Sequence, residues 1–502
     1  MQSVFGDYAR DRVGWFFGLT GGQLATLAVT VLPVFWAIHA QRWALAGALA
    51  GTWAVVALLV VVPVRGRSAT GWLAASVLFL AGRVAGWSRF RSRAAAGRPT
   101  DLGQADLPGV LAGVVVHDGP PHGPAQARIA IIQDHAARTW AVTAAITHPG
   151  IGMADGAARQ RYANGLADLL DVCARTNLID EVHLMVRTVP DDGAERAQWL
   201  AQHRRNGSPT LARTVNNGLA GMLTRASVRT EAFLTLVVPE SRLGREARQA
   251  GGGLDGRARI LYSLIGEVEA QLRASLAMTG VTWLTSPELA LAVRTGFAPA
   301  DRAGIIDARH AKRSNPQVND EVPWAMAGPS GAETEIRHYT HDAWNSISAT
   351  VRLPDKGAAL GALAPVLIPG DPGERRSLCV VFPLLAQSVA DRQSANAEWA
   401  ADMGTALRAK AGVRTRARDR HNTDKAYRLD DKLARGNALV RPYAIACVTV
   451  GNTVRVGEYG RRLDAAIRRA GYAPLRLDLA QDAGFAAATI PLGVSLTRKG
   501  DR

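Results

Sequence analysis

Two long apolar runs near the amino terminus constrain this chain more than any other feature of its sequence. Residues 23–40 and 43–64 contain no Asp, Glu, Lys or Arg, and only Gln41 and Arg42 separate them. The second run has 22 residues, enough for a helix to cross about 30 Å of hydrocarbon, and the first has 18. A backbone in lipid must satisfy its own hydrogen bonds, and so short a connection leaves room only for a turn. We therefore expect two antiparallel membrane helices.

The alternatives for these runs are a buried core hairpin and, for the first run alone, a signal peptide. A signal peptide has a shorter apolar region, followed by a cleavage site with small residues. Here Gln41, Arg42 and Trp43 cluster with His39 at one end of the runs, where a membrane interface accepts polar and aromatic side chains. The sequence therefore favours a membrane hairpin.

Basic residues flank this hairpin. The first hundred residues contain ten basic and two acidic residues, and so supply half of the formal net charge of +16. Only Arg42 lies in the turn, which predicts a multi-pass protein of the plasma (inner) membrane with both termini in the cytoplasm. Anionic lipid explains this local charge better than nucleic acid does. The candidate membrane-surface anchors are Arg65, Arg67, Arg83, Arg89, Arg91 and Arg93.

Length and cysteine content limit what the rest of the chain can be. About 400 of the 502 residues follow the hairpin, which is enough for two or three domains. Cys173, Cys379 and Cys447 are odd in number and far apart, which argues against a disulfide framework and against a clustered metal site. We expect a reducing compartment, no metal and no cofactor.

The body behind the hairpin is predicted to be a cytoplasmic α/β (α+β) structure of two comparable segments. Short β-branched-rich runs predict strands, and apolar residues spaced by three and four predict helices. The expected strands are 109–117, 128–134, 139–147, 181–189, 231–238, 333–340, 346–353, 377–384, 441–450 and 475–479. The expected helices are 155–175, 192–205, 210–224, 256–276, 396–411, 424–437 and 457–470, with a short helix around Gly484.

These patterns divide the chain into five parts. An interfacial helix is expected after the hairpin because Leu73, Val77 and Leu80 recur at helical spacing. A poorly patterned stretch that contains prolines is expected to be a loop. The parts are 1–68 with the hairpin, 69–108 with the interfacial helix and a basic linker, a first α/β domain at 109–300, a loop or linker at 301–332, and a second α/β domain at 333–502.

Two parts of the chain resemble known families. The sequence RVGWFFGLTGGQL at 12–24 leads into the apolar runs and then into GRSATGWL at 66–73. This part resembles the membrane hairpin of the PrgI family of small conjugation proteins, and that of the type VII secretion component EccE. The stretches 396–412, 441–450 and 463–471, and above all QDAGFAAATIPLG at 481–493, are similar to the end of the amino-terminal domain of type IV secretion conjugative ATPases.

The chain also departs from those ATPases. In them a segment comparable to 481–493 leads into the motor domain, but this chain stops nine residues after Gly493. It contains no Gly-x-x-x-x-Gly-Lys-Ser/Thr loop, whose backbone amides would bind phosphates. The combination resembles actinobacterial integral membrane proteins that are found with separate conjugative ATPases.

No sequence pattern predicts a catalytic residue. The glycine-rich stretch 251–256 precedes a helix, but no lysine follows in the phosphate-loop position, so a flexible connector is the simpler interpretation. His338 and His341 would point to opposite faces of a strand and have no cysteine cluster nearby, which disfavours a zinc site. Gly-x-Ser-x-Gly is absent. We therefore expect a protein that is not an enzyme.

A basic run is the best candidate for a partner or phosphate contact. It could bind DNA phosphates or an acidic protein surface, and a solvated helix end is the plainer alternative. Nucleic acid is not favoured, because Tyr427 is the only aromatic residue near the run. The run consists of Arg408, Lys410, Arg414, Arg416, Arg418 and Arg420.

Together these features predict a non-catalytic inner-membrane structural component of a conjugative type IV-like secretion or DNA-transfer machine, which anchors or docks a separate motor ATPase. The expected partners are the lipid bilayer, that ATPase and other membrane components of the machine, with self-association as the competing outcome. A type VII secretion component of the EccE kind is the alternative. A membrane-bound enzyme with a cytoplasmic site is the alternative from another class, and it would need a polar pocket with perturbed ionisable groups.

Overall fold

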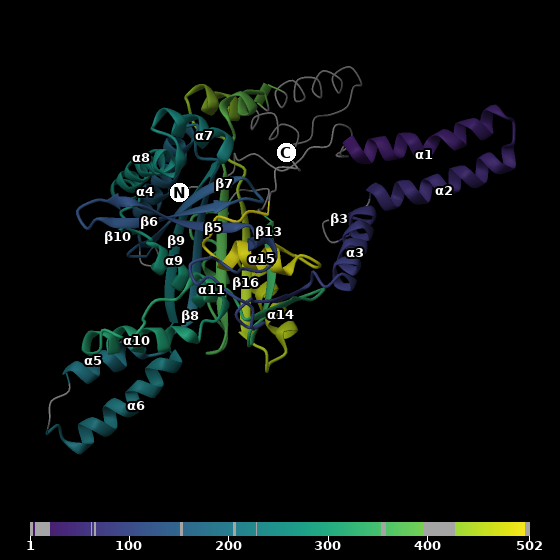
Figure 1. The fold of residues 1–502 in the computed structure, drawn as a ribbon. Coiled ribbons are helices and arrows are strands. Elements are labelled where there is room, and N and C mark those ends of the chain that lie inside the picture. Colours follow the sequence, from purple (N-terminus) through teal and green to yellow (C-terminus); the bar gives the residue numbers. More distant parts are fainter. Residues whose placement is uncertain are drawn as a thin grey trace. The chain divides into compact units, whose positions relative to one another are not determined.

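The computed structural model describes residues 4–5, 21–61, 63–64, 67–150, 154–203, 207–226, 228–352, 358–392, 394–395 and 427–496. The chain divides into two compact units. The smaller is Ala9–Ser88, and the larger combines Met1–Tyr8 with Arg89–Arg502. The elements of both are drawn in Figure 1.

The smaller unit is helical. It contains α1 (Gly21–His39), α2 (Trp43–Val61) and α3 (Ala69–Val84), with a short ladder of β2 (Pro63–Val64) and β3 (Arg67–Ser68) between α2 and α3. α1 and α2 lie side by side as an antiparallel pair (Figure 1), and the Trp53 indole donates a hydrogen bond to the Leu27 carbonyl at 3.2 Å. Gln41, between them, has a φ of 53°, which turns the chain sharply.

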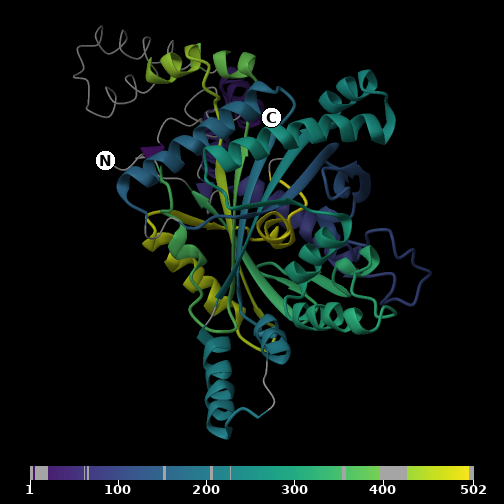
Figure 2. The same cartoon turned by 90° about the vertical axis from the view of Figure 1, so that its left-hand side faces the viewer.

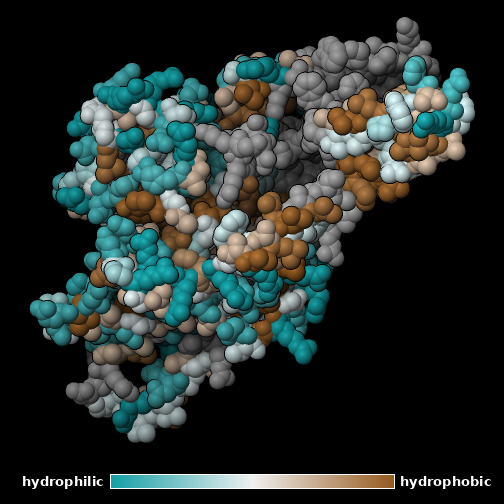
Figure 3. All heavy atoms as spheres, turned by 45° about the vertical axis from the view of Figure 1, so that its right-hand side comes forward, coloured by the Kyte–Doolittle hydropathy of each residue, from teal (hydrophilic) through white to brown (hydrophobic). Residues whose placement is uncertain are grey.

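Among the described residues, α2 is the helix long and apolar enough to cross a membrane. The apolar part of α1, Ala25–His39, is shorter, so the structure does not confirm the predicted second span. Apolar surface gathers along the helix pair in Figure 3. The exposed large apolar side chains of α1 and α2 include Val29, Leu32, Phe35, Trp36, Trp43, Val55 and Leu58.

A sheet of 13 strands is the centre of the larger unit, and all of its ladders are antiparallel. The order is β4-β11-β12-β13-β16-β15-β8-β9-β7-β6-β5, with β10 beside β7 and β17 beside β13. The strands are β4 (Arg89–Arg91), β5 (Val114–His122), β6 (Ala127–Asp134), β7 (Thr139–Thr147), β8 (Glu181–Pro190), β9 (Val228–Pro239), β10 (Gly280–Trp283), β11 (Gly331–Thr334), β12 (Tyr339–His341), β13 (Trp344–Arg352), β15 (Arg375–Pro383), β16 (Tyr443–Gly451) and β17 (Ala473–Arg476).

The two halves of this sheet have the same topology. In the first half, β7 pairs with β9 on one edge and with β6 and β10 on the other, and β9 pairs with β8. In the second half, β13 pairs with β16 on one edge and with β12 and β17 on the other, and β16 pairs with β15. β7 and β13 each have 9 residues, and β10 and β17 each have 4. The halves meet where β8 pairs with β15, so the segments predicted at 109–300 and 333–502 share one sheet.

Helices cover both faces of the sheet (Figure 2). α9 and α15, the helices that follow β10 and β17, pack on the central strands of one face, in a core that includes Met185, Cys379 and Phe485. On the other face, α4, α7 and α8 cover the first half and α14 covers the second. Neighbouring side chains of a strand point to opposite faces of the sheet. On β16, Ile445 therefore lies in the core with α9 and α15, and Ala444 lies in the core with α14 on the opposite face. The bounds are α4 (Gly156–Arg175), α7 (Glu240–Gln249), α8 (Gly253–Ala274), α9 (Ser286–Phe297), α14 (Val456–Arg469) and α15 (Gln481–Thr489).

The connections carry the remaining elements. α5 and α6 lie between β8 and β9 and extend away from the sheet in Figures 1 and 2. The equivalent connection in the second half, between β15 and β16, includes helical residues at 387–392 and 427–434. The bounds are α5 (Ala194–His203), α6 (Thr210–Ala226), α10 (Asp301–Ser314), α11 (Trp324–Ala327), η1 (Gly109–Leu111) and η2 (Ala364–Leu367), with a small ladder of β1 (Val4–Phe5) and β14 (Ala358–Ala359).

The structure confirms the α+β body and corrects several local predictions. The predicted loop at 301–332 contains α10 and α11, because Arg302 and Arg294 fix this charged stretch through ion pairs with Asp192 and Asp301. The predicted linker before residue 108 contains β4, which pairs with β11. α7, α9 and β10 were not predicted from the sequence. The predicted helix at 396–411 lies outside the described residues.

Candidate functional site

The predicted anchor arginines are divided between the two units. Arg67 lies in β3 and Arg83 in the last turn of α3, both in the smaller unit. Arg89 and Arg91 lie in β4, at an edge of the large sheet, and Arg93 follows them; all three side chains are exposed. The structure therefore brings only the last three together. Outside the described residues lie Arg65 and the whole basic run, Arg408, Lys410, Arg414, Arg416, Arg418 and Arg420.

A polar pocket lies where β8 ends, between β9, β15 and α10. We call it the β8–β9 pocket. Its volume is about 250 Å³, and α10 contributes Arg302 to its wall. Arg302 donates to both carboxylate oxygens of Asp192, at 3.0 and 2.9 Å, and also contacts Glu195. The charged lining residues are Asp191, Asp192, Arg229, Glu231, Arg302 and Arg375.

Arg187 connects this pocket to the core between the two halves of the sheet. Its guanidinium donates to Glu231 at 2.6 Å. It also donates to the carbonyl oxygens of Ala292 on α9 and Thr489 on α15, at 2.9 and 3.1 Å. A single buried side chain thus binds equivalent helices of both halves. Removing one partner of such a buried charged network leaves other groups unpaired, which is strongly destabilising.

The arginines keep Asp192 and Glu231 ionised. Burial alone would raise the pKa of Glu231, but the charges of Arg187 and Arg229 outweigh burial and lower it. Burial would likewise raise the pKa of Asp192, and hydrogen bonds from Ala194 and Arg302 lower it. A carboxylate with a lowered pKa is a poor general acid and a weak base near neutral pH. The described lining therefore suits ion pairing better than proton transfer.

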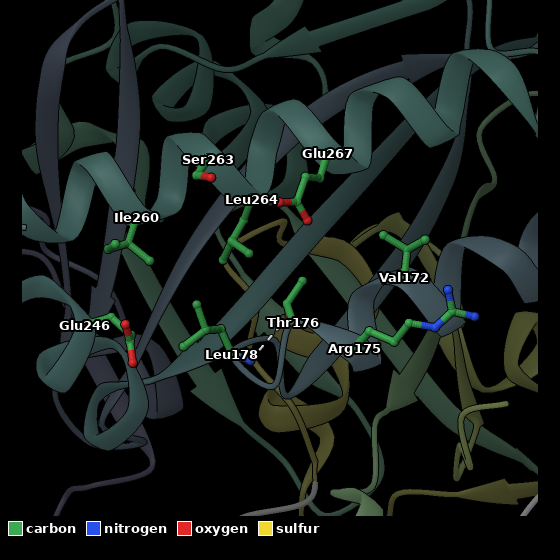
Figure 4. Close-up of a pocket in the computed structure, with 9 residues that line it drawn as sticks. All are labelled: Val172, Arg175, Thr176, Leu178, Glu246, Ile260, Ser263, Leu264 and Glu267. Atoms are coloured by element: carbon green, nitrogen blue, oxygen red, sulfur yellow. Dashed lines mark hydrogen bonds between the residues drawn. The ribbon is translucent and has the colours of Figure 1, made fainter. Parts of the chain in front are cut away.

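A second hollow, of about 430 Å³, is bordered by α4, α7 and α8 (Figure 4). Leu178, Ile260 and Leu264 supply apolar wall, and its charged lining residues are Arg175, Glu246 and Glu267. The nearby Cys173 is buried, and burial raises the pKa of its thiol to about 12. A thiol of that pKa is not a nucleophile at neutral pH.

The second of the two histidines weighed as zinc ligands is a core residue. His341 Nδ1 donates to the Phe297 carbonyl at 2.8 Å, so Nε2 accepts from the Ser346 hydroxyl, also at 2.8 Å. Burial lowers the pKa of His341 to about 3, which keeps the ring neutral. His338 lies outside β12. Within the part of the chain that the structure describes, no group of three or more His, Cys, Asp or Glu side chains is arranged to hold a metal.

The stretch 481–493, on which the ATPase resemblance depends most, lies in the core. α15 occupies its first part, and Gln481, at the start of the helix, is fully buried. β12 and β17 share one edge of β13 and leave a gap at residues 347–348. The Gln481 side chain fills it: Oε1 accepts from the Ser348 amide at 2.7 Å, and Nε2 lies 3.4 Å from the Ser348 carbonyl oxygen. This segment is therefore part of the sheet's scaffold.

One amphipathic helix has an exposed apolar face. Leu211, Val215, Leu219 and Met222 are spaced by three and four along α6, and all are exposed. Isolated helices of this length are marginal in water, so contacts with another surface would stabilise α6. The helix adds to the candidate contact surfaces of the larger unit.

No pattern in the sequence singles out the charged residues of the β8–β9 pocket as a group. They come from β9, β15, α10 and the residues after β8, which are far apart in the chain. The one signal was the presence of Arg187 and Glu231 inside strands that are otherwise largely apolar. No protein-family model matches this chain, and no curated protein matches it.

Proposed function

We propose that this protein is a membrane-anchored, non-catalytic component of a conjugative type IV-like secretion machine, and that its cytoplasmic body docks a separate motor ATPase. In this proposal α1 and α2 both cross the inner membrane, and both termini lie in the cytoplasm. The observation that carries the anchor is the exposure of large apolar side chains along α1 and α2. In lipid these side chains would be covered, whereas in water they would remain exposed as an apolar surface of the kind that marks an interaction site.

Support for docking comes from the larger unit. Its sheet is broad, its two halves are joined through β8 and β15, and Arg187 binds the helices of both. Such a body is a rigid base on which exposed connections can present contact residues. The connection with the basic run and the one with α5 and α6 occupy equivalent positions in the two halves, after β15 and after β8. The resemblance of 481–493 to conjugative ATPases is the sequence argument for this class of partner.

The enzyme alternative required a polar pocket with perturbed ionisable groups, and the β8–β9 pocket has both features. The direction of the shifts does not favour catalysis, because Asp192 and Glu231 are held as ionised carboxylates by arginines. General acid–base work near neutral pH needs a pKa close to the working pH. The EccE-like alternative differs from the main proposal in its partners, so identification of the bound ATPase distinguishes the two.

Charge reversal of the basic run tests the proposal. Arg414→Glu, Arg416→Glu and Arg418→Glu would be combined in the full chain, purified in mild detergent, and capture of the ATPase measured at low and high salt. We expect less capture with an unchanged melting temperature, because charges at the rim of an interface act mainly on association and are screened by salt. The matched control reverses three arginines that the structure shows to be exposed, Arg245, Arg248 and Arg313.

Two results would count against the proposal. Equal capture by the folded triple variant and the control at low salt would remove the basic run from the interface. Failure of the wild-type chain to capture any conjugative ATPase would remove the docking function. Capture of a type VII secretion ATPase would favour the EccE-like alternative.

A further inference from the structure

Arg375 is the charged lining residue of the β8–β9 pocket whose hydrogen bonds are incomplete. Its Nε and Nη1 atoms are buried, and neither has a hydrogen-bond partner among the described residues. The ring of Trp344 lies against the guanidinium, with 4.0 Å between Cζ and the ring centroid. The ring fixes the plane of the guanidinium but accepts none of its in-plane hydrogen bonds.

The other charged residues of the pocket already have hydrogen-bond or ion-pair partners. Glu231 binds Arg187 and Arg229, and Asp192 binds Arg302 and the Ala194 amide. Asp191 accepts from the Gly193 amide at 3.0 Å. No described carboxylate is therefore in ion-pair contact with Arg375. Buried donors of a charged group cost free energy when they remain unsatisfied, so most such groups in proteins have a partner.

We propose that the β8–β9 pocket binds a carboxylate group through Arg375. Carboxylate oxygens match guanidinium N–H groups in geometry and charge, and a desolvated pairing of this kind is stronger than a neutral hydrogen bond. At 250 Å³ the pocket admits a small acid or the end of an acidic side chain and excludes bulky ligands. This inference does not depend on the proposed docking of an ATPase.

The charge of the lining selects among anions. Three acidic side chains, Asp191, Asp192 and Glu231, face three arginines in the wall. A singly charged carboxylate adds one ion pair, with Arg375, to these groups. A phosphate near neutral pH carries up to two charges and would meet repulsion from the acidic residues. The lining therefore favours a monocarboxylate over phosphate or sulfate.

Thermal unfolding of the full chain in mild detergent tests the inference. Acetate, N-acetylglutamate amide, N-acetylglutamine amide and inorganic phosphate are the probes, each titrated at constant ionic strength. A ligand that binds only the folded state raises the melting temperature in a saturable way. We expect saturation with acetate or N-acetylglutamate amide and none with the neutral glutamine analogue. Binding of acetate points to a free acid as the occupant, and binding of N-acetylglutamate amide alone points to a protein side chain.

Two variants localise the binding. Arg375→Gln should weaken the apparent affinity about tenfold or more, whereas Arg245→Gln, at an exposed arginine of α7, should leave it unchanged. Ala300→Trp keeps every charge and fills the exposed mouth of the pocket, so it should also abolish binding, even if Arg375→Gln does not fold. No saturable shift with any carboxylate, phosphate binding as tight as acetate, or binding retained by Ala300→Trp would each overturn the inference.

Discussion

Replacement of Gln481 by leucine tests how the second half of the sheet is closed. The Gln481 amide occupies the gap between β12 and β17 on the edge of β13. The Ser348 carbonyl also accepts from the Leu477 amide at 3.1 Å, so it keeps a partner in the variant. The Ser348 amide, by contrast, donates to Gln481 and loses its acceptor.

The expected cost follows from this difference. Leucine is close to glutamine in size, so the substitution should leave little cavity. An unsatisfied buried N–H costs about 1–3 kcal/mol, and we expect Gln481→Leu to lower the free energy of unfolding by about 2 kcal/mol. Gln249, on α7, is exposed, and Gln249→Leu should change stability by less than about 0.5 kcal/mol.

The stability of a second variant, Gln481→Glu, should depend on pH. A protonated glutamic acid offers one acceptor and one donor, as glutamine does, whereas an ionised one buries a charge. This variant should therefore lose more stability near about pH 7.5 than near about pH 5.5 relative to wild type. The assay is urea unfolding of the full chain in mild detergent, with midpoint and slope both measured. A loss no larger than that of Gln249→Leu would refute the bridging role of Gln481.

Three other predictions concern the core and the membrane anchor. His341 has a pKa of about 3 in the folded chain, against 6.5 in the unfolded chain. The contribution of its neutral ring to the free energy of unfolding is therefore fully present above about pH 6.5 and is lost as pH falls toward 3. His341→Gln should remove about 2 kcal/mol of the wild-type stability difference between pH 7 and about pH 5 in urea unfolding, and an identical pH profile would contradict this. Gly484→Ala should cost about 1–3 kcal/mol in the same assay, because its Cβ would lie 2.5 Å from Leu477 Cδ1, while Gly457→Ala, which has open space, should cost little. A topology reporter fused after Arg98 should be cytoplasmic, and periplasmic activity of the reporter would contradict the predicted orientation.

Local patterns in the sequence predicted elements better than their arrangement. β7 has the predicted bounds, and α4 begins one residue after its prediction, because β-branched runs and helical spacing are local signals. The pairing of β8 with β15 depends on residues almost two hundred positions apart, and no local pattern encodes that register. α10 was missed because its residues are largely charged and its stability comes from contacts such as Arg302 with Asp192.

The candidate site was harder to predict than the fold. Arg375 and Asp192 look like ordinary exposed residues in the sequence, and only the folded chain places both in the wall of one pocket. The basic run was visible at once, because six like charges stand close together in the chain. A charge run can be read directly from a sequence. To predict a pocket whose walls come from distant strands, one must first know how those strands pair.

The most direct test of the central claim is the location of the conjugative ATPase that we propose docks on this protein. Its membrane-bound fraction would be measured by cell fractionation in wild-type cells, in cells that lack the protein, and in cells that express a chain without residues 23–64. We predict that the ATPase is membrane-bound in wild type and becomes soluble in the other two strains. An ATPase that stays at the membrane to the same extent in all three strains would contradict the proposal that this protein anchors it.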